Sequence, residues 1–445
     1  MTLESRTLSK ITWHIVPFLV LCYFLAFIDR INVSIAALTM NRDLGLSPAV
    51  FGFGAGLFFV SYFFLEVPSN ILMQKVGARR WIARIMISWG IVSGATAFVQ
   101  GTNSFYVARL LLGAAEAGFF PAILFYLSCW FPEGARAKVF AYFLAAVPLA
   151  GIIGFPISGL FLSLDGLWGL KGWQWLFLIE ALPTVIVAVI AYYYLTDQPS
   201  DATWLSDEQR EWLLNQLKQD ERQRQGRVRD GNWINLIDIR VICFATIHFC
   251  GNLAIYGLGF FLPQIVKASG FNNFDASLVS ALPYVLGAVG MLVWGSYSAG
   301  GRARMGVFLP FVVGAIGFVG AATTGNPNLM IASLCVASFG ALGYAPGFWT
   351  LPTSLLSGTA SAIAIAAINS IGNFAGFLGP YTIGYLRETT GSFEMGLFVS
   401  AAVMALAAVL ILVATRNKYL AKTSVLQDVE VDAVSALASQ TGAKV

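Results

Sequence analysis

Charged side chains are scarce in this sequence. Asp, Glu, Lys and Arg make up 11% of its 445 residues, whereas they make up about 25% of an ordinary soluble domain. Hydrophobic residues account for 57%. This composition excludes a typical soluble globular protein, because too few charges remain to cover a water-exposed surface. It is typical of a protein embedded in a lipid bilayer.

Motifs of catalysis and metal binding are also missing. The sequence has no Gly-Lys-Ser loop for nucleotide phosphates and no Ser/His/Asp set. Its five cysteines fall in or at the ends of apolar stretches, without metal-ligand spacing, and are interpreted as small hydrophobic residues. We therefore expect no enzyme activity, no metal, no organic cofactor and no nucleic-acid partner.

The sequence contains instead a series of long apolar stretches. Each has about 18 to 26 residues, enough to cross a hydrocarbon core of roughly 30 Å at 1.5 Å per helical residue. The stretches are continuously apolar rather than alternating, which favours helices over barrel strands. We expect an all-α membrane protein with twelve transmembrane helices near 13–38, 48–73, 81–99, 104–129, 139–163, 174–195, 239–266, 275–298, 306–323, 328–352, 360–386 and 393–415.

Positive charges are unevenly divided between the connecting segments. Most of the 27 Lys and Arg residues fall on one side, and the opposite loops keep only Arg42, Lys171, Lys267 and Arg387. Positively charged loops stay in the cytoplasm. This predicts that both termini are cytoplasmic.

One long polar interruption, 196–238, separates six predicted helices from six. We predict an N-terminal six-helix bundle at 1–195, a cytoplasmic linker at 196–238, a C-terminal six-helix bundle at 239–415 and a cytoplasmic tail at 416–445. Within the linker, Leu205–Gln225 has the pattern of an amphipathic helix on the membrane surface. A disordered charged tether is the alternative.

A few ionisable residues lie deep inside the predicted helices, all in the N-terminal half. Each costs roughly 2.5–3.5 kcal/mol at a helix centre if it faces lipid. They must therefore face one another or a water-filled cavity. These residues are Asp29, Arg30, Glu66, Arg109 and Glu116, with Glu180 nearer a helix end.

The spacing of these residues favours a shared site. Arg109 and Glu116 are seven residues apart, which returns them to one helix face about 10 Å apart. Asp29 and Arg30 are adjacent and point about 100° apart, so one can face a cavity and the other a neighbouring helix. A static network of buried ion pairs is the alternative, and it carries most weight for Glu66 and Glu180.

Arg30 is our candidate contact for an anionic group, since a guanidinium binds a carboxylate through two hydrogen bonds. Asp29 and Glu116 are candidate proton carriers, because a buried carboxylate near an arginine can bind and release a proton as its surroundings change. The coupling ion would then be the proton.

The C-terminal half has polar rather than charged candidates. Asn369 and Asn373 are four residues apart, as are Asn252 and Tyr256. Such pairs share a helix face and can bind a hydroxyl or carboxylate, or they can join helices to one another. His248 can titrate near neutral pH, but a lone histidine is more often a packing residue. We therefore leave it out of the predicted site.

Several motifs resemble the anion:cation symporter family of the major facilitator superfamily. FIDRINVSIA (Phe27–Ala36) and RLLLGAAE (Arg109–Glu116) are similar to its first-helix and fourth-helix signatures. YFFLEVPSN (Tyr62–Asn70) and DQPSDATWLSDEQREWL (Asp197–Leu213) resemble the branch of bacterial tartrate, phthalate and hydroxyphenylacetate permeases. The carboxylate usual in the loop after the second helix is missing, since Gln74 stands there.

The resemblance implies a two-bundle fold in the bacterial inner membrane, alternating access and proton-coupled uptake of organic anions, with a monomer sufficient. It implies that Asp29 and Glu116 are protonation sites, that Arg30 contacts the substrate anion, and that Arg109 is the partner of Glu116. Tyr62, Asn369 and Asn373 would line the cavity.

We therefore predict a proton-coupled symporter for a small tartrate-, phthalate- or sugar-acid-like carboxylate. Arg30, Tyr62, Tyr256, Asn369 and Asn373 would bind the substrate, and Asp29, Glu116 and Arg109 would couple it to protons. An aromatic content of 14% mildly favours an aromatic acid, while hydroxy acids fit Arg and Asn equally well. A facilitator or exchanger without proton coupling is the alternative, followed by a non-transporting sensor.

Overall fold

Helices make up every regular element in the part of the chain that the structure describes. The structure, a computed structural model, describes residues 2–226, 239–355 and 359–415. Eleven helical segments in these ranges are long and apolar enough to cross a membrane. The predicted all-α membrane class is confirmed, while the number twelve and the cytoplasmic termini stay predictions.

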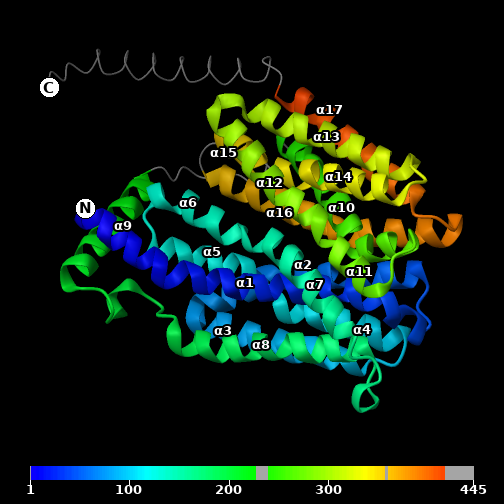
Figure 1. The fold of residues 1–445 in the computed structure, drawn as a ribbon. Coiled ribbons are helices and arrows are strands. Elements are labelled where there is room, and N and C mark those ends of the chain that lie inside the picture. The colour runs from blue at the N-terminus through cyan, green and yellow to red at the C-terminus, as the bar shows by residue number, and fades with distance from the viewer. Residues whose placement is uncertain (1, 227–238, 356–358, 416–445) are drawn as a thin grey trace.

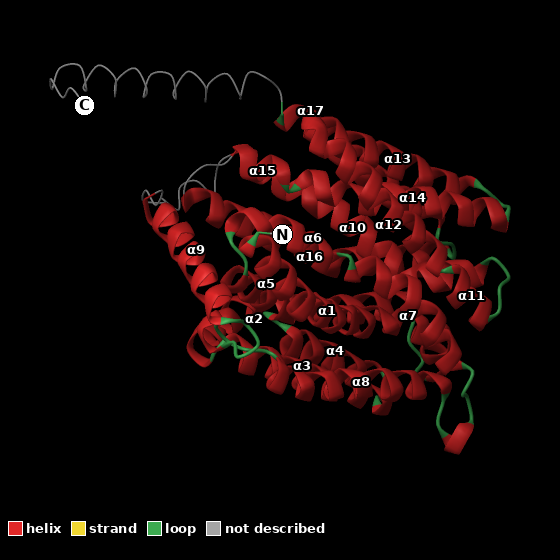
Figure 2. Ribbon diagram, turned by 60° about the vertical axis from the view of Figure 1, so that its left-hand side comes forward, coloured by secondary structure: helices red, strands yellow, loops and turns green. Residues whose placement is uncertain are grey.

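The helices form two groups joined by a linker helix (Figures 1 and 2). The first group contains α1 (Leu3–Asp43), α2 (Pro48–Val76), α3 (Ala78–Ala95), α4 (Thr102–Glu116), α5 (Phe119–Trp130), α6 (Glu133–Leu144), α7 (Ala146–Leu162) and α8 (Gly172–Tyr194). The linker contains α9 (Asp207–Gly226). The second group contains α10 (Ile239–Ala268), α11 (Asn273–Val279), α12 (Ala281–Tyr297), α13 (Ala303–Thr323), α14 (Pro327–Phe348), α15 (Thr350–Leu355), α16 (Thr359–Thr390) and α17 (Glu394–Ala414).

The predicted boundaries between bundles, linker and tail stay predictions. The last linker residues, 227–238, and the tail, 416–445, lie outside the described residues.

Four predicted helices are each divided in two. The predicted span 104–129, for example, is split into α4 and α5 at Ala117 and Gly118. Gly118 has φ +87°, and a Cβ there would lie 2.4 Å from the Ser69 hydroxyl. Only glycine fits this left-handed, crowded position. The break makes Glu116 the last residue of α4. The other spans are divided into α6 and α7, α11 and α12, and α14 and α15.

The two groups meet along a close contact between α2 and α16. A Cβ on Gly52 would lie 2.4 Å from the carbonyl oxygen of Pro380, so the two backbones touch. At the start of α2, the Ser47 hydroxyl and the Ala49 N–H donate to the carboxylate of Glu388 in α16, the latter at 2.9 Å. The groups are therefore joined at the end where α1 connects to α2.

The linker helix packs against the first group. Leu213 of α9 is fully buried, and Trp204 stacks on Trp130 with ring centroids 5.4 Å apart. The Glu133 N–H donates to Asp220 at 2.7 Å. The predicted linker helix is confirmed for Asp207–Gly226, and this segment is not a disordered tether. Its position on a membrane surface stays a prediction.

A linker residue supplies a carboxylate at the junction of α2 and α3. Asp197 accepts a hydrogen bond from the Arg79 N–H at 2.8 Å, and its carboxylate is 3.6 Å from the Arg79 Nε. A negative charge at the start of α3 interacts favourably with the helix dipole. Asp197 thus provides a carboxylate beside a loop whose own sequence lacks one.

We predict that Gly113→Ala destabilises the protein by about 1–3 kcal/mol, because overpacking forces helices apart. A Cβ at Gly113 of α4 would lie 2.0 Å from the carbonyl oxygen of Phe58 in α2. Gly134→Ala is the matched control, since no atom lies within 4 Å of its added Cβ. Thermal unfolding of the full chain in detergent is the measurement. Equal stability of both variants would contradict close packing of α2 on α4.

Candidate functional site

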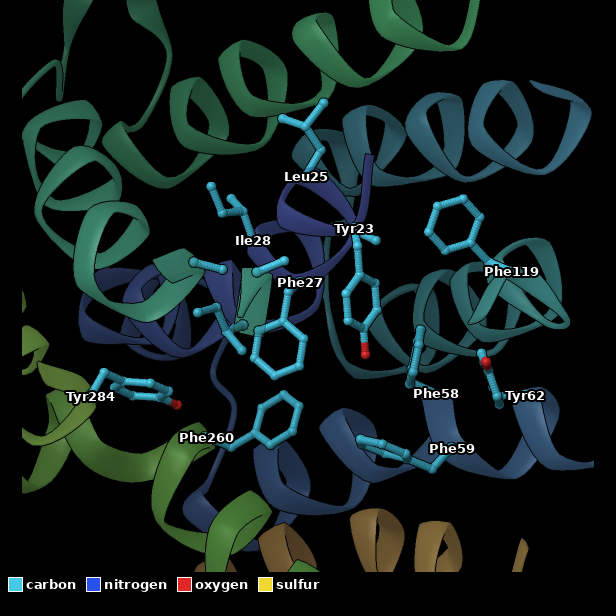
Figure 3. Close-up of a cluster of buried hydrophobic side chains, with 14 of the residues drawn as sticks. Tyr23, Leu25, Phe27, Ile28, Phe58, Phe59, Tyr62, Phe119, Phe260 and Tyr284 are labelled. Carbon is cyan, nitrogen blue, oxygen red and sulfur yellow. The ribbon is translucent and has the colours of Figure 1, made fainter. Parts of the chain in front are cut away.

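A cavity of about 170 Å³ lies between the two groups of helices. Pockets for drug-sized ligands measure roughly 300–1,000 Å³, so this one fits a smaller molecule. The cavity is lined by Tyr23, Arg30, Phe58, Phe59, Tyr62 and Phe120 from the first group and by His248, Asn252, Tyr256, Trp349, Asn369 and Asn373 from the second. Figure 3 labels four of these residues, Tyr23 of α1 and Phe58, Phe59 and Tyr62 of α2, within a cluster of buried hydrophobic side chains.

All five residues predicted to bind substrate lie on the cavity wall. They come from four helices in both groups, so the fold brings together residues that are far apart in the sequence. Their roles stay predictions. The five are Arg30, Tyr62, Tyr256, Asn369 and Asn373.

An ion pair between Arg30 and Glu116 joins α1 to the end of α4. The Arg30 guanidinium donates to the Glu116 carboxylate, and their side chains are only 9% and 1% exposed. Arg30 also lies over the rings of Phe58 and Tyr62, at 5.0 and 5.7 Å from the ring centroids. Aromatic faces attract a cation, and more strongly without water. Arg30 thus binds Glu116 and also contacts aromatic rings of α1 and α2.

Arg109 lies behind the cavity wall, next to the same ring. Its guanidinium is 5.3 Å from the centroid of Phe58, and it donates to the Ala55 carbonyl oxygen at 3.4 Å. The resemblance implied that Arg109 pairs with Glu116, but among the described residues the direct ion pair of Glu116 is with Arg30. Two helical turns separate Arg109 from Glu116 along α4, while the helix end places Glu116 against α1.

Asp29 faces away from the cavity, toward α3 and α8. Its carboxylate accepts hydrogen bonds from Trp89 Nε1 at 2.9 Å, Ser93 Oγ at 2.7 Å and Thr184 Oγ1 at 2.9 Å. Neighbouring residues on a helix point about 100° apart, so Arg30 reaches the cavity while Asp29 reaches the neighbouring helices. Asp29 is a buried carboxylate held by neutral donors, with no salt bridge among the described residues.

Glu180 is a second buried carboxylate held by a neutral donor. It accepts a hydrogen bond from the Ser158 hydroxyl at 2.5 Å. Glu66 is buried beside the cavity residue Tyr62, one turn along α2. Neither makes a salt bridge among the described residues, and neither lines the cavity.

The set of residues predicted to bind substrate omits two polar residues of the cavity wall. His248 was left out and Asn252 was named as a candidate only, yet both line the cavity. His248, Asn252 and Tyr256 follow one another at intervals of four residues on α10, so they share a face. The same spacing in the sequence could have placed His248 in the predicted site.

Comparisons with known proteins place the chain among membrane transporters. Residues 19–380 match the sequence model of the Major Facilitator Superfamily. A candidate tartrate transporter of Agrobacterium vitis is 47% identical over 416 residues, which cover 93% of this chain and 92% of that protein. The inner membrane transport protein RhmT of Escherichia coli K12 is 39% identical over 427 residues, covering 95% and 98%. A quinolone resistance transporter of Acinetobacter baumannii is 39% identical over 407 residues, covering 91% and 94%.

Solved structures support the same fold. A bacterial homolog of the human lysosomal transporter Spinster, inward-facing and occupied, aligns with a TM-score of 0.76 at 16% identity, covering 91% of this chain and 97% of that one. The xylose transporter XylE of Escherichia coli, partially occluded and inward open, aligns with a TM-score of 0.70 at 13% identity, covering 91% and 99%.

The buried ion pair predicts a strongly coupled pair of mutations. Arg30→Gln leaves the Glu116 charge buried without its partner, and Glu116→Gln does the same to Arg30, so each single change should destabilise the protein by about 3–5 kcal/mol. The double variant removes both charges and should recover most of that loss. Thermal unfolding of the four proteins in detergent measures the coupling. Additive losses would show that the two charges do not interact.

Proposed function

Since this chain belongs to the Major Facilitator Superfamily and is a multi-span membrane transporter, we propose that it imports a small organic carboxylate together with protons. The observation that carries this proposal is the position of Arg30, which faces the cavity and also binds Glu116. Among the cavity-lining residues of the described chain, Arg30 alone has a permanent positive charge. An anionic ligand and Glu116 therefore compete for the same guanidinium.

This competition couples protons to the ligand. A second carboxylate beside Arg30 leaves two negative charges facing one positive charge in a poorly hydrated site, which is costly. A proton on Glu116 removes one negative charge and frees the guanidinium. Binding of the proton and binding of the anion therefore favour each other, which is what symport requires.

Asp29 offers a second place for a proton. Its three hydrogen-bond donors come from α3 and α8, whereas its neighbour Arg30 faces the ligand. Protonation of Asp29 changes how α1 is held against these helices. Because Arg30 is the next residue, such a change reaches the cavity, and in this way proton binding at Asp29 contributes to the transition between the two access states.

The cavity fits a small carboxylate of the tartrate, phthalate or sugar-acid type. Its volume is small, and aromatic rings and asparagine amides line it together with Arg30. The relatives named for tartrate transport and for the inner membrane support this class of cargo and a bacterial inner-membrane location. We propose both termini on the cytoplasmic side and a monomer as the working unit, without enzyme activity or a cofactor other than the proton.

A facilitator or exchanger without proton coupling is the second candidate. It needs Arg30 for the anion but does not need a proton on Glu116. The favouring observation is that the ion pair also links α1 to α4, which gives both charges a structural role without any proton transfer. The two functions predict different transport behaviour for a variant in which residue 116 carries no charge.

We predict that Glu116→Gln abolishes accumulation driven by a proton gradient but retains exchange of the substrate across the membrane. The neutral side chain mimics the protonated state, so the site binds the anion without taking up a proton. Purified protein in liposomes is tested with labelled tartrate, phthalate and gluconate, with and without an inward proton gradient. Arg30→Gln should weaken binding about 10- to 100-fold, as expected for loss of a charge-assisted hydrogen bond.

The exposed Glu211 of α9 provides a matched control, and Glu211→Gln should behave as the unchanged protein. Gradient-driven accumulation by Glu116→Gln equal to that of the unchanged protein would reject coupling at this residue. If the unchanged protein equilibrates a carboxylate to the same level with and without the proton gradient, the facilitator is favoured.

A further inference from the structure

Three polar side chains of the second group form a closed set of hydrogen bonds at the cavity wall. His248 Nδ1 lies 3.0 Å from the Tyr344 hydroxyl, which lies 3.3 Å from Asn252 Oδ1. Asn252 Nδ2 lies 3.3 Å from His248 Nε2. We call His248, Tyr344 and Asn252 the polar triad. His248 and Asn252 line the cavity, whereas Tyr344 lies behind them and is 1% exposed.

A backbone carbonyl fixes the orientation of the whole polar triad. Asn252 Nδ2 also donates to the carbonyl oxygen of Gly372 in α16 at 3.0 Å. The amide nitrogen must therefore face Gly372 and His248, and the amide oxygen must face Tyr344. It follows that His248 Nε2 accepts, His248 Nδ1–H donates to Tyr344, and the Tyr344 hydroxyl donates to Asn252.

Packing holds the triad in this arrangement. The His248 ring stacks on Phe348 with centroids 5.1 Å apart, and the Tyr344 ring stacks on Phe311 at 4.6 Å. Gly372 leaves room for the histidine, since a Cβ there would lie 2.1 Å from His248 Cδ2. The triad is therefore a rigid, preorganised group.

The triad is neutral, and so is the wall around it. Its hydrogen bonds are complete with an uncharged imidazole, because Nε2 must accept from the Asn252 amide. The other cavity-lining residues that the structure describes in this group are Tyr256, Trp349, Asn369 and Asn373, and none has a permanent charge. A free carboxylate against this wall would lack a cation and would be costly to bury.

Asn252 Oδ1 keeps a hydrogen-bonding capacity that the triad does not use. A carbonyl oxygen has two lone pairs, and the Tyr344 hydroxyl occupies one of them. The remaining lone pair accepts a donor such as a hydroxyl group. Arg30 across the cavity supplies donors only. The two walls therefore differ in charge and in the hydrogen-bonding groups that they offer.

We propose, resting on the carboxylate transport proposed above, that the polar triad binds a hydroxyl group of the cargo while Arg30 holds its carboxylate. The cargo is thus a hydroxylated carboxylic acid, with a hydroxyl rather than a second carboxylate facing the second group of helices. Asn252 makes the contact, and His248 and Tyr344 are positioning residues that keep its oxygen in place.

Four acids with a four-carbon chain separate the effect of hydroxyl groups from the effect of a second carboxylate. Threonate has hydroxyls and one carboxylate, tartrate has hydroxyls and two, butyrate has no hydroxyl and one carboxylate, and succinate has no hydroxyl and two. Affinities are measured by calorimetry on the purified full chain. Hydroxyls should strengthen binding at least about tenfold for either number of carboxylates, since an acid without a hydroxyl forgoes a hydrogen bond that the site is arranged to make. The second carboxylate should give no gain.

Tyr344→Phe tests the positioning role. It removes one hydroxyl behind the wall and leaves the cavity lining unchanged, so butyrate and succinate should bind as before while the advantage of the hydroxylated acids falls to about twofold or less. Tyr284→Phe, at another buried tyrosine that does not line the cavity, should keep the full advantage. A general loss of folding would weaken the binding of all four acids equally. It would therefore leave unchanged the ratio of affinities between acids with and without hydroxyls.

The outcomes distinguish this proposal from the function on which it rests. One contrary result is an affinity that falls when Arg30 is replaced but is the same for acids with and without hydroxyls. Another is that succinate binds as tightly as tartrate. Either result would overturn the role of the polar triad and leave carboxylate binding intact. A full hydroxyl advantage in Tyr344→Phe would also overturn it. Failure of all four acids to bind would overturn both.

Discussion

The ion pair between Arg30 and Glu116 is the constraint on which the rest of the site depends. In a membrane interior a lone charge is costly, so each of these residues needs the other or a substitute. The break after Glu116 allows the pair to form, because it ends α4 with the carboxylate against α1. Under the proposed function, two requirements follow from this one contact: an anion from outside competes with Glu116, and Glu116 loses its charge when the anion takes its place.

Much of the site was predictable from the sequence because lipid penalises polar groups. Arg30 stood out as a charge inside an apolar stretch. Asn369 stood out because it is four residues from Asn373, and Tyr256 because it is four residues from Asn252. The pairing of Glu116 with Arg30 rather than with Arg109 was not predictable. It depends on the left-handed Gly118, which in the sequence resembles the many other glycines within these helices.

The two groups of helices divide the chemistry of the cavity between them. The first group provides Arg30 and the carboxylates behind it, while the second provides neutral hydrogen-bonding side chains. A neutral wall can move relative to a charged one without separating an ion pair across the interface, so such motion avoids the large cost of isolating a buried charge. The charge balance of the site is therefore set within the first group, whatever the position of the second.

The contacts that join the two groups near the start of α2 have a different character from the ion pair. Glu388 binds the start of α2 through the Ser47 hydroxyl and the Ala49 N–H, and these groups are exposed to solvent. Water can replace such hydrogen bonds at little net cost. The backbone contact of Gly52 with Pro380 is steric and shape-dependent, and contains no charge. Loss of these particular contacts therefore removes only weak or replaceable interactions, whereas in the proposed mechanism the buried pair responds to protons and ligand. A transporter needs this separation, because the step that selects the cargo must be energetically strong and the step that releases it to the other side must be easily reversed.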